Sequence, residues 1–165
     1  KKITEHYYNL NRILKQLSNV YKKKIIVCIH PNDDLESKKK YFSDFEVVKY
    51  QTRENIYKAF MVLFFQSTAI IDAILLKKKI LTIISNAMDE NQINAGFHWI
   101  KELGIEKINI DDDIIVDSDN KNAFLLKLDN ATKNYSNFIN SYVAPDGSNL
   151  GYEKIANKLK SKFFN

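Results

Sequence analysis

The chain has 165 residues and 19.3 kDa, the size of one ordinary domain, which excludes a two-domain enzyme with a complete cleft between its domains. Hydrophobic residues make up 45% and charged residues 27%, with 4 glycines and 2 prolines, so disordered, collagen-like and disulfide-framework proteins are excluded. The net charge of +5 comes from lysine, since Arg12 and Arg53 are the only arginines. Nucleic-acid recognition favours arginine forks, so this charge does not indicate a nucleic-acid-binding protein.

The predicted elements alternate between helices and strands along the chain. Residues 4–21 carry apolar side chains at spacings of three and four, which predicts an amphipathic helix. Residues 25–29 form an unbroken apolar run, typical of a parallel strand buried on both faces. The elements predicted after it are helices over 34–42, 52–59 (N-cap Thr52), 66–76, 93–103, 122–142 and 151–164, and strands over 45–50, 61–65, 80–84 and 107–110.

This alternation predicts a single α/β domain over residues 1–165. We expect a doubly wound, Rossmann-like parallel sheet of about five strands in the order 2-1-3-4-5, with helices on both faces and a helical tail over about 119–165. In such a sheet ligands bind where the strand order reverses, here between the carboxyl ends of the first and third strands. Those ends carry His30-Pro31 and Gln66-Ser67-Thr68.

The residues at these two strand ends suit phosphate binding. The hydroxyls of Ser67 and Thr68 can converge on an anion together with the free amides of a first helical turn, although plain N-capping explains them equally well. His30 can hydrogen-bond a phosphate and, when protonated, stabilise charge on a leaving nucleotide; otherwise it only ends a strand. Asp72, one turn beyond Thr68, can steady the loop, reach a ribose or simply be exposed. His6 and His98 lack such partners and are expected to be surface or packing residues.

Other site types find little support in the sequence. Cys28 cannot pair within the chain, which indicates a reducing compartment and hence the cytoplasm. No apolar stretch reaches the ~20 residues of a membrane span, and no secretory signal opens the chain.

A response-regulator receiver is excluded because no aspartate ends the third strand. The run Asp111-Asp112-Asp113 predicts a solvated turn rather than a metal site, because three consecutive side chains do not converge.

The segments IIVCIHPNDD and VVKYQTRENIYKAFMVLFFQSTAIIDAILLKKKILTII resemble the carboxyl-terminal half of GT-B glycosyltransferases of surface-polysaccharide synthesis. The likeness is strongest to enzymes that carry an HP motif followed by an S[ST] motif, as bacterial sialyltransferases and Kdo transferases do. Teichoic-acid glycerophosphotransferases have a similar layout. The resemblance covers about residues 7–84, and beyond residue 85 only the general pattern of elements matches.

The resemblance implies a role for each matching residue. His30-Pro31 stands at the HP motif, which contacts the nucleotide phosphate of a CMP-linked donor. Ser67-Thr68 stands at the S[ST] motif, which holds the same phosphate, with Gln66 beside it. Tyr50 and Gln51 correspond to the loop whose backbone meets the nucleobase. The resemblance implies no metal and no other cofactor, since such enzymes stabilise the leaving phosphate with helix dipoles and side chains.

The expected function is therefore that of a nucleotide-sugar-binding domain of a cytoplasmic glycosyltransferase in capsule or lipopolysaccharide biosynthesis. Its partners are a nucleotide sugar and, through a separate amino-terminal half, a glycan acceptor; nucleic acid is not expected, and a longer parent protein can associate peripherally with a membrane. The isolated domain is expected to be inactive, because the acceptor site and catalytic base come from the other half. Two alternatives stay open: a non-catalytic α/β binding or interaction module, and half of a nucleotide-sugar 2-epimerase-like enzyme, for which no cleft carboxylates are found.

Overall fold

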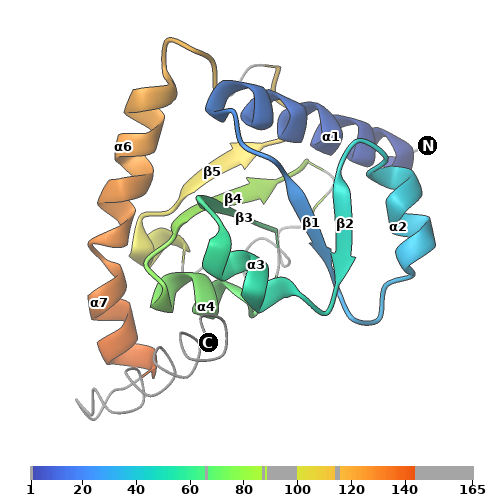
Figure 1. Cartoon of the computed structure of the whole chain (residues 1–165). Helices are drawn as coiled ribbons and strands as arrows, with labels where there is room; N and C mark the ends of the chain where they lie inside the picture. Colours follow the sequence, from blue (N-terminus) through green and yellow to red (C-terminus); the bar gives the residue numbers. More distant parts are fainter. Residues whose placement is uncertain (1, 66, 87, 89–99, 114–115, 144–165) are drawn as a thin grey trace.

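The structure is a computed structural model that describes residues 2–65, 67–86, 88, 100–113 and 116–143 (Figure 1). The chain is a mixed α/β protein, as predicted. Its elements are α1 (Lys2–Tyr21), β1 (Ile26–Ile29), α2 (Leu35–Tyr41), β2 (Glu46–Lys49), α3 (Thr52–Lys58), β3 (Met61–Phe64), α4 (Ile70–Leu75), β4 (Lys79–Ile84), β5 (Glu106–Asn109), α6 (Lys121–Thr132), α7 (Tyr135–Phe138) and the π-helix η1 (Ile139–Val143). The helix predicted over 151–164 and most of the one predicted over 93–103 lie outside the described residues.

Each pair of hydrogen-bonded strands is parallel, but the strands form two sheets instead of the single five-stranded sheet that we predicted. One sheet pairs β1 with β2, and the other has the order β3-β4-β5. Within the described ranges, β1 and β3 are not hydrogen-bonded to each other, so the expected 2-1-3-4-5 order is broken at that place (Figure 1). The two-sided burial predicted for residues 25–29 is also wrong, because β1 buries only Ile29 and exposes 38% of Ile26, whereas β4 is buried from Ile80 to Ile83.

Helices cover both faces of the β3-β4-β5 sheet, because its side chains alternate between two apolar clusters. Leu81 and Ile83 of β4 pack with Ile13 and Leu17 of α1 and with Leu128 of α6. The side chains of opposite parity, such as Ile80, join the second cluster, whose other members include Ile56, Phe64, Ile70, Ile74, Leu103, Tyr135 and Phe138. Each fully buried aliphatic side chain contributes on the order of 1.5–3 kcal/mol, so this sheet is the centre of stability.

Several helix ends differ from the sequence-based expectation. Gln51, not Thr52, is the N-cap of α3, and its side chain makes no capping hydrogen bond. α4 begins at Ile70, so Ser67 and Thr68 precede the helix instead of opening it. The single helix predicted over 122–142 is divided near Asn134, whose side chain donates to the carbonyl of Leu103 at 3.0 Å.

Gly104 follows the helical residues 100–103 with a φ of +64°, as expected of a helix C-cap. Within the described residues, no helix is both long enough and apolar enough to cross a membrane.

Candidate functional site

His30 and Pro31 form an exposed turn after β1, where the sequence predicted them. The backbone N–H of Asn32 donates to Nδ1 of His30 at 3.1 Å, and the N–H of Asp33 donates to the His30 carbonyl at 2.9 Å. A neutral imidazole that accepts at Nδ1 carries its proton on Nε2. His30 therefore holds the tautomer that can donate a hydrogen bond to a phosphate oxygen.

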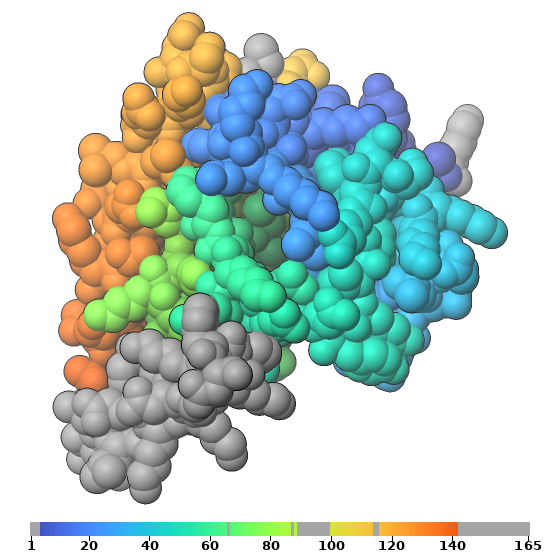
Figure 2. Space-filling model, viewed as in Figure 1, coloured from blue at the N-terminus to red at the C-terminus, as the bar shows by residue number. Residues whose placement is uncertain are grey.

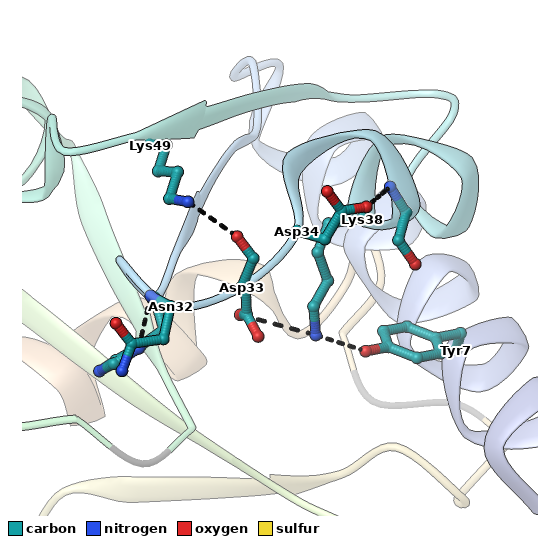
Figure 3. Close-up of polar contacts among 8 residues, drawn as sticks. Tyr7, Asn32, Asp33, Asp34, Lys38 and Lys49 are labelled. Carbon is teal, nitrogen blue, oxygen red and sulfur yellow. Dashed lines mark hydrogen bonds and ion pairs between the residues drawn. The ribbon is translucent and has the colours of Figure 1, made fainter.

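A polar network that the sequence did not reveal holds this turn in place (Figure 3). Nζ of Lys38 donates to the hydroxyl of Tyr7 at 2.9 Å and lies 3.6 Å from a carboxylate oxygen of Asp33. Nζ of Lys49 donates to the backbone carbonyl of Asp33 at 2.9 Å. The hydrogen bond to Tyr7 raises the pKa of Lys38, against the effect of burial, so its ammonium stays charged. The network joins α1, α2 and the end of β2 to the turn.

Tyr50 follows β2 in the left-handed backbone region, with a φ of +65°. Its side chain is 75% exposed, and its hydroxyl lies 3.5 Å from the carbonyl of Pro31. The other described non-glycine residues with positive φ, Lys22 and Lys77, follow the ends of helices α1 and α4, where this conformation is common. Tyr50 follows a strand and not a helix, so its conformation, which costs about 1–2 kcal/mol, has no such explanation.

Ser67 and Thr68 are exposed in the turn between β3 and α4. Oγ of Ser67 accepts from the N–H of Ala69 at 3.2 Å, and the two carbonyls accept from Ile70 and Ile71. The expectation that their hydroxyls stand at a helix start is wrong, because α4 begins at Ile70 and has six residues. The hydroxyl of Thr68 makes no hydrogen bond within the described part of the chain. Gln66 lies outside the described residues.

Asp72 pairs with Arg53, a residue that the sequence analysis did not place in the site. Nε of Arg53 donates to a carboxylate oxygen of Asp72 at 3.0 Å, and this ion pair joins α3 to α4. The Arg53 side chain is 71% exposed, and its two terminal nitrogens make no hydrogen bond with described residues. Asp72 thus steadies the region, one of the roles expected for it, and it holds a cationic fork one helical turn from Thr68.

Residues 49–53 connect the two predicted motifs. Lys49 and Tyr50 contact the turn that carries His30 and Pro31, and Arg53 contacts α4 just after Ser67 and Thr68. No hydrogen bond or ion pair joins the motifs directly among the residues that the structure describes. Gln51 is exposed, and its carbonyl accepts from the backbone N–H of Asn55. We call the residues 30–33, 49–53 and 67–72 the strand-end site.

A second polar cluster lies at the ends of β4 and β5, around Asp111. One carboxylate oxygen of Asp111 accepts from Asn9 at 2.9 Å, and the other accepts from the Ser85 hydroxyl at 3.1 Å and from the N–H of Asn86 at 2.7 Å. Burial acts to raise the pKa of Asp111, but these hydrogen bonds outweigh it and the pKa is lowered. The run Asp111-Asp112-Asp113 lies in a turn, as predicted, and Asp112 and Asp113 are exposed. Asp111 departs from the prediction of a solvated side chain, because it is half-buried and hydrogen-bonded to the protein.

His6 and Arg12 of α1 flank this second cluster. The ring of His6 lies 5.7 Å from that of Phe65, and burial lowers the pKa of His6, so it is a packing residue as expected. The guanidinium of Arg12 donates to the carbonyls of Ile110, Asp112 and Asp113. The described residues contain no group of histidine, cysteine and carboxylate side chains arranged to hold a metal ion.

The strand-end site can bind an anion. It presents a hydrogen-bond donor on His30 and the hydroxyl of Thr68, which has no partner among the described residues. It also presents two cations, Lys49 and Arg53, of which only Arg53 is paired with a carboxylate within the same part of the chain. Comparison of the chain with known protein families, with curated proteins and with solved structures finds no match.

Proposed function

We propose that this chain is the nucleotide-sugar-binding domain of a cytoplasmic glycosyltransferase of capsule or lipopolysaccharide biosynthesis, with a CMP-linked donor. One observation supports the proposal above the others: residues 49–53 contact both the turn of the HP motif and the helix after the S[ST] motif. In the proposed parent enzyme the chain forms the Rossmann-like donor half of a GT-B fold, and the glycan acceptor binds the other half.

In this proposal the donor phosphate lies among His30, Thr68, Lys49 and Arg53. A phosphodiester carries one negative charge, which Lys49 complements, while the Arg53 fork and the Thr68 hydroxyl donate hydrogen bonds to its oxygens. In the transfer step an acceptor hydroxyl bonds the sugar carbon and gives its proton to the catalytic base of the other half. As the bond between that carbon and the phosphate oxygen breaks, CMP leaves and negative charge grows on its phosphate. Donation from Nε2 of His30 stabilises that charge, which is the catalytic role proposed for this residue.

Titration of the protein with CMP, CDP and UDP, followed by backbone amide NMR shifts, tests the proposal. We expect CMP to shift the amides near His30, Tyr50 and Thr68, and we expect His30→Ala to weaken CMP binding about tenfold, the loss of one charge-assisted hydrogen bond. If none of the three nucleotides shifts these amides, the proposal is wrong.

A non-catalytic binding or interaction module is the second candidate, and two local hydrogen bonds favour it. Oγ of Ser67 caps the N–H of Ala69, and Nδ1 of His30 caps the N–H of Asn32, so both motifs already serve as turn caps. Thr68→Val separates the two candidates, because the Thr68 hydroxyl makes no hydrogen bond with the described residues. Glycosyltransferase donor binding predicts weaker CMP binding with little change in stability. The second candidate predicts that Thr68→Val changes neither CMP binding nor the free energy of unfolding. It also predicts that Ser67→Ala lowers the free energy of unfolding by about 1 kcal/mol, because the cap is lost.

A further inference from the structure

Two runs of three lysines and the single residue Lys58 meet at the edge of the molecule where the strands begin. Lys22–Lys24 lie between α1 and β1, and Lys58 ends α3 just before β3. Lys77 and Lys78 lie between α4 and β4, and Lys79 is the first residue of β4. In parallel α/β structures the helices run back against the strands, so the helix ends gather at the amino ends of the strands. This edge is opposite the strand-end site, which lies at the carboxyl ends.

Phe60 sits at the centre of this group with its side chain 41% exposed. Nζ of Lys23 and Nζ of Lys79 each lie 5.6 Å from the centre of its ring, and the ring of Tyr21 lies 6.0 Å away. The segments that carry Lys23, Phe60 and Lys79 adjoin on the face shown in Figure 2, where they are blue, teal-green and yellow-green. Ile26, at the start of β1, adds a second exposed apolar side chain.

The charges of this edge are only partly balanced. Lys24, Lys58 and Lys79 pair with carboxylates, those of Glu46, Glu54 and Asp129 respectively. Nζ of Lys78 turns inward and donates to the carbonyls of Tyr57 and Ala59, which secures the turn that presents Phe60. Lys22, Lys23 and Lys77 are exposed and have no carboxylate within ion-pair distance in the described part of the structure. We call Lys22–Lys24, Ile26, Lys58, Phe60, Lys77 and Lys79 the lysine edge.

We propose that the lysine edge binds the surface of an anionic lipid membrane. Lysines around an exposed aromatic ring suit a lipid surface, because the ammonium groups attract the headgroups while Phe60 enters the boundary with the acyl chains. Both arginines lie elsewhere, in α1 and α3, so the edge lacks the forks that favour nucleic-acid phosphates. Binding by this edge leaves the strand-end site facing away from the membrane.

Flotation of the full chain with lipid vesicles tests this proposal, independently of any nucleotide. We expect binding to equimolar phosphatidylcholine and phosphatidylglycerol, little binding to phosphatidylcholine alone, and release in about 1 M salt, where the Debye length is about 3 Å. The combined change Lys22→Gln, Lys23→Gln and Lys77→Gln should weaken vesicle binding more than tenfold. The control, Lys15→Gln, Lys39→Gln and Lys40→Gln, removes the same charge from α1 and α2, where Lys15 and Lys39 pair with Asp44 and Glu36. It should bind much more tightly than the first variant.

Phe60→Ser tests the apolar part of the lysine edge without changing charge. We expect it to weaken vesicle binding severalfold, and we expect Phe60→Leu to restore binding; thermal unfolding of each variant shows that it is folded. Three results would overturn the proposal: equal binding to neutral and anionic vesicles, equal losses in the two triple variants, or tighter binding to duplex DNA or single-stranded RNA than to anionic vesicles at the same salt concentration.

Discussion

Asn9 and Asp111 are 102 positions apart in the sequence, and the side-chain nitrogen of Asn9 lies 2.9 Å from a carboxylate oxygen of Asp111. This hydrogen bond joins α1 to Asp111, which lies two residues after the end of β5. Because the other carboxylate oxygen of Asp111 accepts from Ser85 and Asn86 after β4, one side chain connects three segments of the chain. Asp111 is therefore a structural residue that keeps α1 against the carboxyl ends of the central sheet.

Asp111→Asn should lower the free energy of unfolding by about 1–3 kcal/mol, measured by urea denaturation. The new NH₂ group faces hydrogen-bond donors on either side, so at least one of them loses its acceptor. Asp112→Asn is the matched control, because that neighbouring side chain is exposed, and its effect should stay within about 0.5 kcal/mol. Equal effects of the two substitutions would contradict the structural role of Asp111.

The stability that Asp111 provides should disappear in acid. Its pKa in the folded protein lies below the usual value of 3.8, so the folded state favours the ionised form. This contribution is complete above the pKa of the unfolded chain and is lost as the pH falls through the lower pKa of the folded state. The difference in unfolding free energy between the wild type and Asp111→Ala should therefore be constant near neutral pH and shrink below pH 3.8. If the difference in unfolding free energy stayed constant down to about pH 2, the lowered pKa of Asp111 would be contradicted.

Tyr50→Gly should raise the free energy of unfolding by about 0.5–1 kcal/mol, because glycine adopts a positive φ without the steric cost that Tyr50 pays. Tyr50→Ala keeps that cost and should not stabilise the protein. Thermal unfolding of the two variants measures the difference. If alanine and glycine have the same effect, the backbone at Tyr50 is not strained.

Thr82→Val should stabilise the protein by about 1 kcal/mol. The Thr82 side chain in β4 is fully buried, and its hydroxyl has no hydrogen-bond partner among the described residues. Valine has nearly the same shape and removes the buried polar atom. Thr132→Val is the control, and it should destabilise the protein, because the Thr132 hydroxyl donates a hydrogen bond to the carbonyl of Asp129 at 2.7 Å. Chemical denaturation of both variants gives the comparison, and a destabilised Thr82→Val would contradict the prediction.

The sequence placed the candidate residues correctly relative to the strands, where the signal was local. His30 and Pro31 end β1, Tyr50 and Gln51 follow β2, and Ser67 and Thr68 follow β3, all as expected. Arg53 was missed because its meaning depends on Asp72, which lies 19 positions away on another helix. The network of Lys38, Tyr7 and Asp33 was missed for the same reason, because Tyr7 lies 31 positions from Lys38 on another helix. In the sequence, Lys38 and Asp33 look like ordinary surface residues.

The sequence by itself determined the order and type of the described elements up to α6 and the two-sided burial of β4. It did not show the break between α6 and α7 or the π-helix η1, and it predicted for residues 25–29 a two-sided burial that β1 lacks. The properties that it determined depend on the spacing of apolar side chains along one segment, which is a local property of the sequence. Only the tertiary structure decided that β1 leaves the central sheet, that α4 begins after Ser67 and Thr68, and that Asp111 is held by hydrogen bonds. Strand pairing and burial of a carboxylate depend on which distant surfaces fit together, and local periodicity carries no information about that fit.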